Sequence, residues 1–398
     1  MGARPSKGRS SPPSTGLPQD PSSPSSSPWM DLQPDFADLL LRRLTSHADR
    51  VRFAAVCCHW RYVAREYSSH GLPPPLPWVR FPKGAFKNLS DGKWHFFRIR
   101  EQDTCNGTFG NWQLFEEEEP RHGCHYYLKN PLSGATMRLP GRYDESIYLN
   151  KDGSREMSST RRWSEFKIQK VIVCSDDLVA AKVSYYLHCS EMQSVVVCCR
   201  PGMSSWSRGL SNGHWYADMA FYGQKLYAVT REGHLFAHEV ATNTSKPWVY
   251  QIEQVIPAPS SDGFFLESPC AMSCYLVISH TGKLLMVRWV RTPQNKKVEL
   301  KVFEADLKML QWLEVKSLDD QVLFVSSDCS KAISASGDGD YMEGNKIYLA
   351  DYSLNLFLYG SSHTNESACV YDMTSNKFQP LSLGGGITRA WHVAWFFP

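Results

Sequence analysis

The residues of this chain that come closest to a metal-binding pattern are two pairs of histidines and cysteines. His122 and His125 stand in the segment HGCH, and Cys270 and Cys274 are separated by three residues. A structural zinc site takes four ligands, so a specific motif has a second pair at a defined distance. Neither pair has such a partner. We interpret them as surface histidines and buried thiols, and the sequence predicts no metal ion and no cofactor.

A second pattern, GLSNG at residues 209–213, matches the Gly-x-Ser-x-Gly motif of a hydrolase around Ser211. That chemistry requires a buried strand before the serine and a helix after it, so that the hydroxyl stands on a tight turn. The flanking stretches SSWSR and HWYADMAFYG predict neither element. We interpret the motif as a polar loop and expect no catalytic residue.

Three further segments have suggestive compositions but lack the spacing that their chemistry needs. SGDGDYMEGN, at residues 336–345, is acidic but does not have the ligand positions of a calcium loop. GGGI, at residues 384–387, is not followed by the lysine of a phosphate loop. The four glutamates at residues 116–119 are typical of a solvated loop. The sequence therefore favours a binding protein over an enzyme.

The bulk composition excludes several classes of partner. The 398 residues include 43 Lys and Arg against 40 Asp and Glu, a net charge of +3. So small an excess gives no reason to expect nucleic acid or an anionic membrane. No stretch approaches the roughly 20 apolar residues of a membrane helix, and the first residues lack the apolar core of a secretory signal. Cysteine pairs inside apolar runs, at residues 57–58 and 198–199, favour reduced thiols, so we expect an intracellular protein of the nucleus or cytoplasm.

The chain changes character twice along its length. Residues 1–28 are rich in Ser and Pro and predict a disordered tail. PDFADLLLRRL then predicts a helix beginning at Pro34, and Ser46 and Asp49 offer caps for the stretch that follows. In DRVRFAAVCCHWRYVARE, residues 49–66, apolar side chains recur at steps of three and four on two faces. Such a stretch either breaks into two helices or covers its second face with a partner.

The prolines of GLPPPLP, at residues 71–77, end helical structure, and the remaining roughly 300 residues predict an all-β region. Three segments in it are similar: VFEADLKMLQWLEV from Val302, VYDMTSNKFQPLSL from Val370 and YLKNPLSGATMRLP from Tyr127. Each consists of a strand, a polar turn and a second strand. At about 40 to 50 residues per blade, such a repeat predicts a β-propeller of six or seven blades. Thirteen tryptophans are available for its core and its binding face. Candidates for the binding face are Trp94, Trp112, Trp163, Trp206 and Trp215, but the sequence does not identify the substrate-binding residues.

The first ordered segment, WMDLQPDFADLLLRRLTSHADRVRFAAVCCHWRYVARE, resembles an F-box, a small all-α domain of three helices. The resemblance implies that the residues matching the F-box pattern contact a Skp-type adaptor. These predicted adaptor-binding residues are Leu32, Pro34, Leu39, Leu40, Leu44, Val51, Phe53, Val56, Cys57 and Trp60. One position departs from the pattern: Gln33 stands where many relatives have a proline directly after the leucine.

The rest of the chain resembles a plant family of F-box proteins with a KIB-type β-propeller. The resemblance rests on the phrases LPPPLPWVRFP, NPLSGATMRLP, CRPGMSSW, FYGQKLYAV and GNKIYLADY, in this order. It implies an F-box at residues 29–68, a proline-rich linker leading into the propeller at residues 69–92, and the propeller at residues 93–398. It also implies the substrate-recognition subunit of an SCF (Skp–cullin–F-box) ubiquitin ligase, joined through the adaptor to a cullin and binding an unidentified target protein.

Physical reasoning supports an adaptor for the small helical domain. About 40 residues are close to the lower limit at which a domain buries enough surface by itself, so a second apolar face is best covered by another protein. Three alternatives stay open: a helical cap packed on the propeller, a non-degradative binding protein with a vestigial F-box, and a propeller with catalysis or a metal at its channel.

Overall fold

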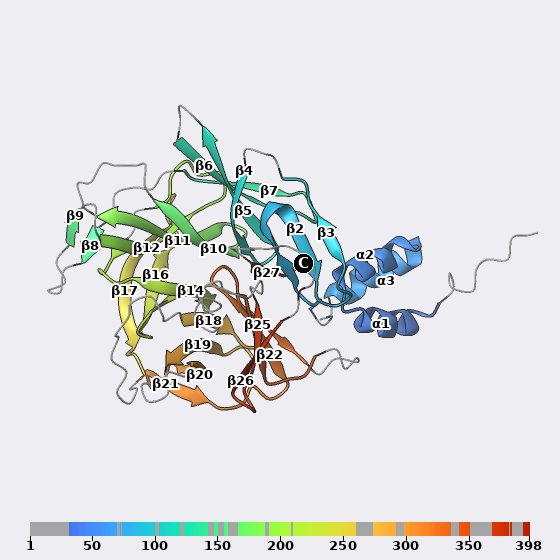
Figure 1. The fold of residues 1–398 in the computed structure, drawn as a ribbon. Coiled ribbons are helices and arrows are strands. Elements are labelled where there is room, and N and C mark those ends of the chain that lie inside the picture. The colour runs from blue at the N-terminus through green and yellow to red at the C-terminus, as the bar shows by residue number, and fades with distance from the viewer. Residues whose placement is uncertain are drawn as a thin grey trace, which may run out of the picture.

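The computed structural model describes residues 32–69, 72, 74–99, 103–119, 123–141, 147–149, 155–157, 166–187, 191–207, 210–259, 274–291, 298–335, 342–350, 368–381, 383 and 393–398. The tail predicted for residues 1–28 lies outside these ranges. Three helices come first and are followed by a propeller of six blades, so the predicted fold class is confirmed with the lower of the two blade numbers (Figure 1).

The three helices are α1 (Pro34–Arg43), α2 (His47–Ala55) and α3 (Cys58–Ser69). Pro34 occupies the first turn of α1, where its missing N–H costs nothing. The stretch at residues 49–66 does break into two helices, at Val56 and Cys57. Ser46 precedes α2 as predicted, but its hydroxyl makes no capping hydrogen bond within the helix.

The helices share a small core of their own. Ala37 and Leu41 of α1, Phe53 of α2, and Val63 and Ala64 of α3 are buried against one another. The rings of Phe53 and Trp60 lie 4.5 Å apart between centroids. The core is thin because, among the side chains that the structure describes, each helix contributes one or two buried ones.

The described strands form six sheets, which are the blades of the propeller. The first contains β1 (Trp78–Arg80), β2 (Ala85–Asn88), β3 (Trp94–Phe96) and β27 (Ala394–Phe396). The second contains β4 (Asp103–Phe109), β5 (Trp112–Glu119), β6 (Gly123–Lys129) and β7 (Thr136–Leu139). The third contains β8 (Ile147–Leu149), β9 (Arg155–Met157), β10 (Lys167–Ser175), β11 (Leu178–Leu187), β12 (Glu191–Cys199) and β13 (Leu210–Ser211).

The other three sheets follow in chain order. The fourth contains β14 (Tyr216–Tyr222), β15 (Lys225–Thr230), β16 (Leu235–Ala241) and β17 (Trp248–Ile256). The fifth contains β18 (Cys274–Ile278), β19 (Leu284–Arg291), β20 (Val298–Asp306) and β21 (Gln311–Val315). The sixth contains β22 (Gln321–Ser326), β23 (Lys331–Ser334), β24 (Lys346–Ala350), β25 (Cys369–Asp372) and β26 (Lys377–Pro380).

The ring is closed by the last strand of the chain. β27 pairs antiparallel with β1, with Trp78 opposite Phe396, so the first blade is built from both ends of the sequence. Trp395 donates its indole N–H to the carbonyl oxygen of Val325 in the sixth blade, at 2.9 Å. The strands β27, β4, β10, β14, β18 and β22 contact each other in this order around the centre (Figure 1).

The three similar segments are the outer hairpins of three blades, β6–β7, β20–β21 and β25–β26. Their turns share one side-chain device. Asn130, Asp306 and Asp372 each use a side-chain oxygen to accept hydrogen bonds from the backbone N–H groups two and three residues later. Such a turn is specified locally by the Asx residue, which explains why the repeat is visible in the sequence.

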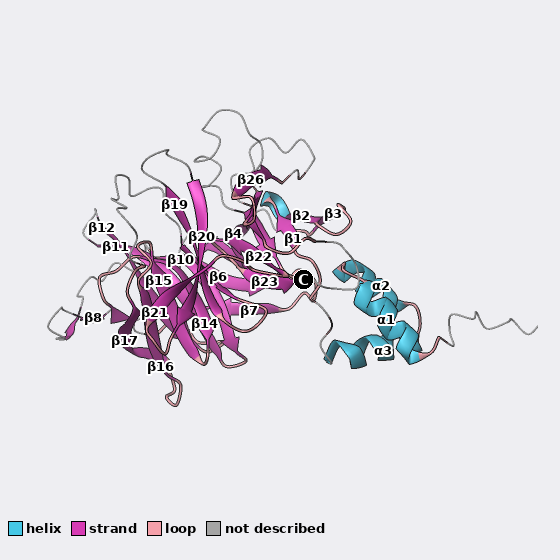
Figure 2. Ribbon diagram, turned by 90° about the horizontal axis from the view of Figure 1, so that it is seen from below, coloured by secondary structure: helices cyan, strands magenta, loops and turns pink. Residues whose placement is uncertain are grey.

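The helices lie beside the first blade (Figure 2), and the loop between α1 and α2 is hydrogen-bonded to this blade and to the segment just before it. Asn88 on β2 donates a side-chain hydrogen bond to the Ser46 hydroxyl, at 3.1 Å, and both residues are buried. Leu76 donates its backbone N–H to the carbonyl oxygen of Thr45, at 2.9 Å. β1 and β2 lie within residues 69–92, the range predicted for the proline-rich linker and the entry to the propeller.

Candidate adaptor surface and propeller channel

Four of the predicted adaptor-binding residues keep large parts of their apolar side chains in contact with solvent. Leu39 is 48% exposed, Leu40 40%, Val51 55% and Val56 55%. Pro34 is also exposed. In α1 the exposed leucines lie next to the buried Leu41, so the helix has an apolar inner face and an apolar outer face. The outer face is available to another protein.

Other predicted residues belong to the inside of the helical domain. Phe53 is 5% exposed and sits in the core, with Leu32, Leu44 and Trp60 packed around it. Cys57 is half-buried at the break between α2 and α3, where its Sγ accepts a hydrogen bond from the N–H of Trp60 at 3.4 Å. The ten predicted residues therefore divide into an exposed set and a set that holds the helices together.

Two exposed residues were missed by sequence reasoning: Phe36, 57% exposed, and Tyr62, 64% exposed. Phe36 could have been found, because it precedes Leu39 and Leu40 by three and four residues and so shares their side of α1. We call the exposed apolar side chains of the helices the adaptor surface; its members are Phe36, Leu39, Leu40, Val51, Val56 and Tyr62. Within the described ranges they are six of the thirteen exposed large hydrophobic residues. The helices thus hold almost half of the exposed apolar side chains in a small part of the chain.

A groove of about 740 Å³ separates the helices from the proline-rich linker. Arg50 and Arg61 line this groove, and their guanidinium groups donate hydrogen bonds to the carbonyl oxygens of Leu44 and Ala54, at 2.7 and 3.2 Å. Burial lowers the pKa of Arg50 from its ordinary value. Burial also lowers the pKa of His47, with a smaller contribution from Arg50.

Gln33 does not disturb the start of the first helix. Its carbonyl oxygen accepts the N–H groups of Phe36 and Ala37, each at 3.1 Å, although its side chain makes no capping bond. The departure from the F-box pattern therefore leaves the geometry of α1 intact in this structure.

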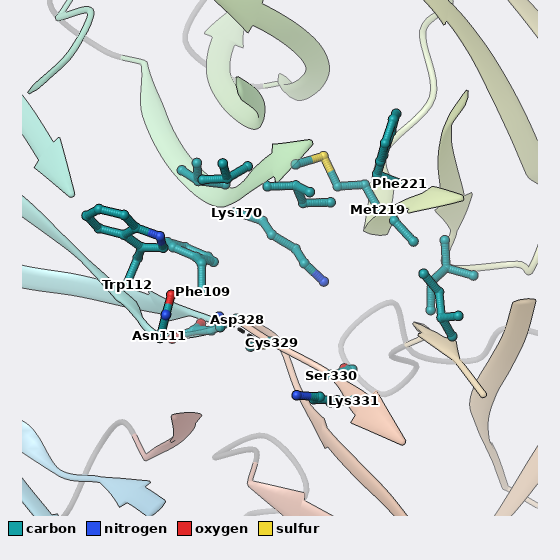
Figure 3. Close-up of a pocket in the computed structure, with 17 residues that line it drawn as sticks. Phe109, Asn111, Trp112, Lys170, Met219, Phe221, Asp328, Cys329, Ser330 and Lys331 are labelled. Carbon is teal, nitrogen blue, oxygen red and sulfur yellow. Dashed lines mark hydrogen bonds between the residues drawn. The ribbon is translucent and has the colours of Figure 1, made fainter. Parts of the chain in front are cut away.

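The propeller has a cavity of about 410 Å³ in its central channel (Figure 3). Its wall is formed by the turn between β4 and β5, the inner strands β10, β14 and β18, and the turn between β22 and β23. Phe109, Trp112, Met219 and Phe221 make apolar parts of this wall. Lys170 enters from β10, and its amine is directed into the cavity in Figure 3. We call this space the channel cavity.

A buried ion pair joins three blades beside the channel cavity. The Lys170 amine lies 2.5 Å from Oδ1 of Asp218, and both side chains are less than a tenth exposed. Asp218 also accepts hydrogen bonds from the backbone N–H groups of Met219 and Leu276, each at 2.8 Å. Because β10, β14 and β18 belong to consecutive blades, this carboxylate fixes their mutual position.

Two further cations, Lys182 and Arg80, are buried in the propeller. Lys182 donates to the carbonyl oxygens of Tyr216 and Ala217 at 3.3 and 2.7 Å, and burial lowers its pKa to about 8. Arg80 lies 3.9 Å from Asp328, which accepts the backbone N–H of Thr108 at 3.2 Å. These two cations lie on the second strands β11 and β1 of their blades, whereas the buried ion pair lies on the inner strands β10 and β14.

Only one member of each candidate metal-binding pair lies within the described residues. His122 and Cys270 lie outside them, His125 is exposed and Cys274 is buried in β18. Searching the described ranges finds no group of three or more possible metal ligands. In the same ranges no helix is both long and apolar enough to span a bilayer.

Two predicted loops are strands instead. Ser211 lies in β13 and is 1% exposed, so the GLSNG motif is not a polar loop around an accessible serine; Gly209 is outside the description. The glutamates at residues 116–119 belong to β5. Glu116 accepts a hydrogen bond from the Tyr126 hydroxyl at 3.1 Å, because strand pairing brings the two residues opposite each other.

The five candidate tryptophans have different surroundings. Trp112 lines the channel cavity, whereas Trp206 is completely buried and Trp94 packs on Phe81 at 4.9 Å between ring centroids. Trp215 lies under the guanidinium of Arg231, 5.7 Å from ring centroid to Cζ. Trp163 lies outside the described residues. Of the tryptophans described, Trp112 is the one that the structure places at the channel cavity.

A three-helix domain with an unpaired apolar surface, followed by a closed six-bladed ring, defines a propeller protein built for interaction with other proteins. The model of the KIB1-4 beta-propeller family matches residues 86–372, so the chain belongs to this family. F-box protein SKIP23 of Arabidopsis thaliana is 23% identical, over 88% of this chain and 90% of its own length. F-box protein KIB4 of the same plant is 22% identical, over 92% and 94%. The predicted resemblance to plant F-box proteins with a KIB-type propeller is confirmed.

Proposed function

We propose that this protein is the substrate-recognition subunit of an SCF-type ubiquitin ligase. The F-box docks on a Skp-type adaptor, which connects it to a cullin, and the propeller binds the target protein. The observation that carries the proposal is the adaptor surface, whose six apolar side chains are exposed on helices with a thin core. Stable interfaces of this kind bury apolar side chains that a lone domain leaves in water.

The chain itself performs no bond chemistry in this proposal. Ubiquitin transfer needs a nucleophile and an activated carbonyl, which other subunits of such a ligase supply. The contribution of the chain is to hold the target close to the loaded enzyme and so to raise its effective concentration. We propose that it does so inside the cell, in the nucleus, the cytoplasm or both.

Affinity capture of the tagged full-length chain from plant cells, with the proteasome blocked, tests the proposal. The adaptor and cullin are expected in the wild-type sample and absent with a variant whose adaptor surface is polar, while propeller ligands are retained by both. Capture of cullin by both samples, or by neither, contradicts the proposed function.

The second candidate function is a non-degradative binding protein with a vestigial F-box; its support is the departure of Gln33 from the F-box sequence pattern, although α1 keeps its geometry there. It predicts that the abundance of the propeller ligand stays unchanged when cullins are inhibited. A rise in abundance that requires the adaptor surface favours the ligase instead.

A further inference from the structure

The buried side chains of the described residues carry more positive than negative charge. Within the described residues, the charged side chains that are less than a tenth exposed are four cations and one acid: Arg80, Lys170, Lys182, Arg288 and Asp218. The side chain of Asp328, 18% exposed, adds a second acid. Burying a charge without an opposite charge is costly. At the channel cavity itself, Lys170, Lys331 and Asp328 form part of the wall, Asp218 pairs with Lys170, and Arg80 lies 3.9 Å from Asp328. Three cations therefore stand against two acids there, an excess of one positive charge that favours an anion.

Lys170 is placed to meet such an anion. Its ammonium has three N–H donors, and the described residues give it one hydrogen bond, to Asp218. The Asp218 carboxylate is already held by two backbone N–H groups as well as by Lys170, so its charge is compensated. The remaining donors of Lys170 can serve a ligand in the channel cavity, into which its amine is directed (Figure 3).

The other groups of the wall define the rest of the ligand. Lys331, an exposed residue whose amine lies 5.3 Å from the centroid of the Phe397 ring, adds a second ammonium to the wall. Phe109, Trp112 and Phe221 offer apolar surface. The described lining contains lysines and no arginine. Bidentate arginine is the side chain best matched to phosphate, so two lysines beside apolar walls fit a single carboxylate on an apolar body better.

We propose that the channel cavity binds an acidic side chain of the target, Asp or Glu, flanked by apolar residues. This inference rests on the proposed function, because it names the class of segment that the propeller selects. The carboxylate meets Lys170 and Lys331, and the flanking side chains cover the aromatic wall. The cavity of about 410 Å³ has room for a few side chains and not for a folded domain, so the segment enters as an extended or turn-forming peptide.

Binding of peptides to the purified full-length chain, without adaptor, tests the inference. The probes are an array of blocked pentapeptides with Leu, Val, Phe or Met around a central Glu, and matched arrays with Gln or phosphoserine at the centre. The free acid 3-phenylpropanoate and its amide represent a small-molecule source of the same chemistry. The best glutamate peptides are expected to bind roughly tenfold or more tightly than their Gln counterparts, as one hydrogen bond to a charged group predicts.

Two variants and a control locate the binding. Lys331→Gln is expected to remove most of the preference for Glu over Gln. Lys170→Met combined with Asp218→Leu removes the cavity ammonium together with the carboxylate that pairs with it, and is expected to do the same. Lys283→Gln is the matched control, because this exposed lysine on the fifth blade pairs with Glu304 and does not line the cavity. It is expected to leave the preference unchanged.

Several results would overturn the inference. They are equal binding of Glu and Gln peptides, no effect of Lys331→Gln, tightest binding by phosphoserine, and binding of 3-phenylpropanoate without any peptide. Adaptor affinity is measured on the same samples. Loss of peptide selectivity with intact adaptor binding contradicts only this inference, whereas absence of adaptor binding contradicts only the proposed function.

Discussion

Replacing three residues of the adaptor surface, Leu39→Ser, Leu40→Ser and Val56→Ser, should strongly weaken binding to a Skp-type adaptor. The side chains are 48%, 40% and 55% exposed, so about half of each is still available for burial in an interface. None belongs to the core of the helices, which Leu41 and Phe53 anchor. The substitutions should therefore act on the interface and not on folding.

The size of the effect follows from the area left to bury. Complete burial of a Leu or Val side chain is worth roughly 1.5–3 kcal/mol, so half-burial contributes about 1 kcal/mol per residue. The triple substitution therefore removes about 3 kcal/mol of binding free energy, which raises the dissociation constant by about two orders of magnitude. Buried hydroxyls without partners would increase the loss further.

Isothermal titration of the full-length chain with a purified Skp-type adaptor measures this change. The control is Phe96→Ser, Met309→Ser and Leu313→Ser, which removes three apolar side chains of the propeller that are 75%, 70% and 43% exposed. Thermal unfolding of both variants checks that they are folded. A folded triple variant of the helices whose dissociation constant stays within about threefold of the wild-type value would have lost less than roughly 1 kcal/mol of binding free energy. That result would show that the adaptor surface has been assigned to the wrong residues.

Three further outcomes are expected for the folded chain. Ser46→Ala leaves the buried amide of Asn88 without its acceptor. It should lower the free energy of unfolding, measured by denaturant titration, by about 1–3 kcal/mol. An unchanged free energy of unfolding would show that water replaces the hydroxyl. Trp395→Phe removes the indole hydrogen bond to the carbonyl oxygen of Val325 that helps close the ring. It should lower the free energy of unfolding by about 1–2 kcal/mol in the same assay. No change is expected if ring closure depends on the pairing of β27 alone. Burial lowers the pKa of His238 to about 4 in the folded chain, against 6.5 in the unfolded chain. Between pH 6.5 and 4 the imidazole is therefore protonated in the unfolded state but neutral in the folded state. The free energy of unfolding falls as the pH drops through this range. His238→Leu should make this decrease in the free energy of unfolding smaller by about 3 kcal/mol. If the free energies of unfolding of wild type and variant depend on pH in the same way, His238 is not the group responsible.

The parts of the fold that the sequence predicts well are those specified by neighbouring residues. The three outer hairpins are recognisable because Asn130, Asp306 and Asp372 set their turns through bonds to the next few backbone groups. The number of blades is not encoded in this way. It depends on β27 joining β1 from the other end of the chain, and on β8 and β9 extending the sheet of β10, which are pairings between distant segments.

The candidate sites show the same division between local and distant information. Periodicity identifies the apolar positions of α1, but it does not tell which of Leu40 and Leu41 faces inward, since the answer depends on where α3 packs. The channel cavity has no sequence signature at all. Lys170 and Asp218 meet only because two blades place their inner strands side by side, and Asp328 reaches the channel from a third.

The connection between the two halves of the molecule has a consequence for the proposed ligase. The Ser46–Asn88 bond is buried, and the neighbouring Thr45 accepts the backbone N–H of Leu76, so the helices are fixed both to the first blade and to the segment that enters it. A target in the channel cavity would then be held at a set position relative to the adaptor, because neither joint is a flexible tether. Effective concentration depends on such geometry and is lost when the two ends cannot meet. Weakening this connection should therefore reduce ubiquitin transfer to a bound target more than it reduces the binding of either partner.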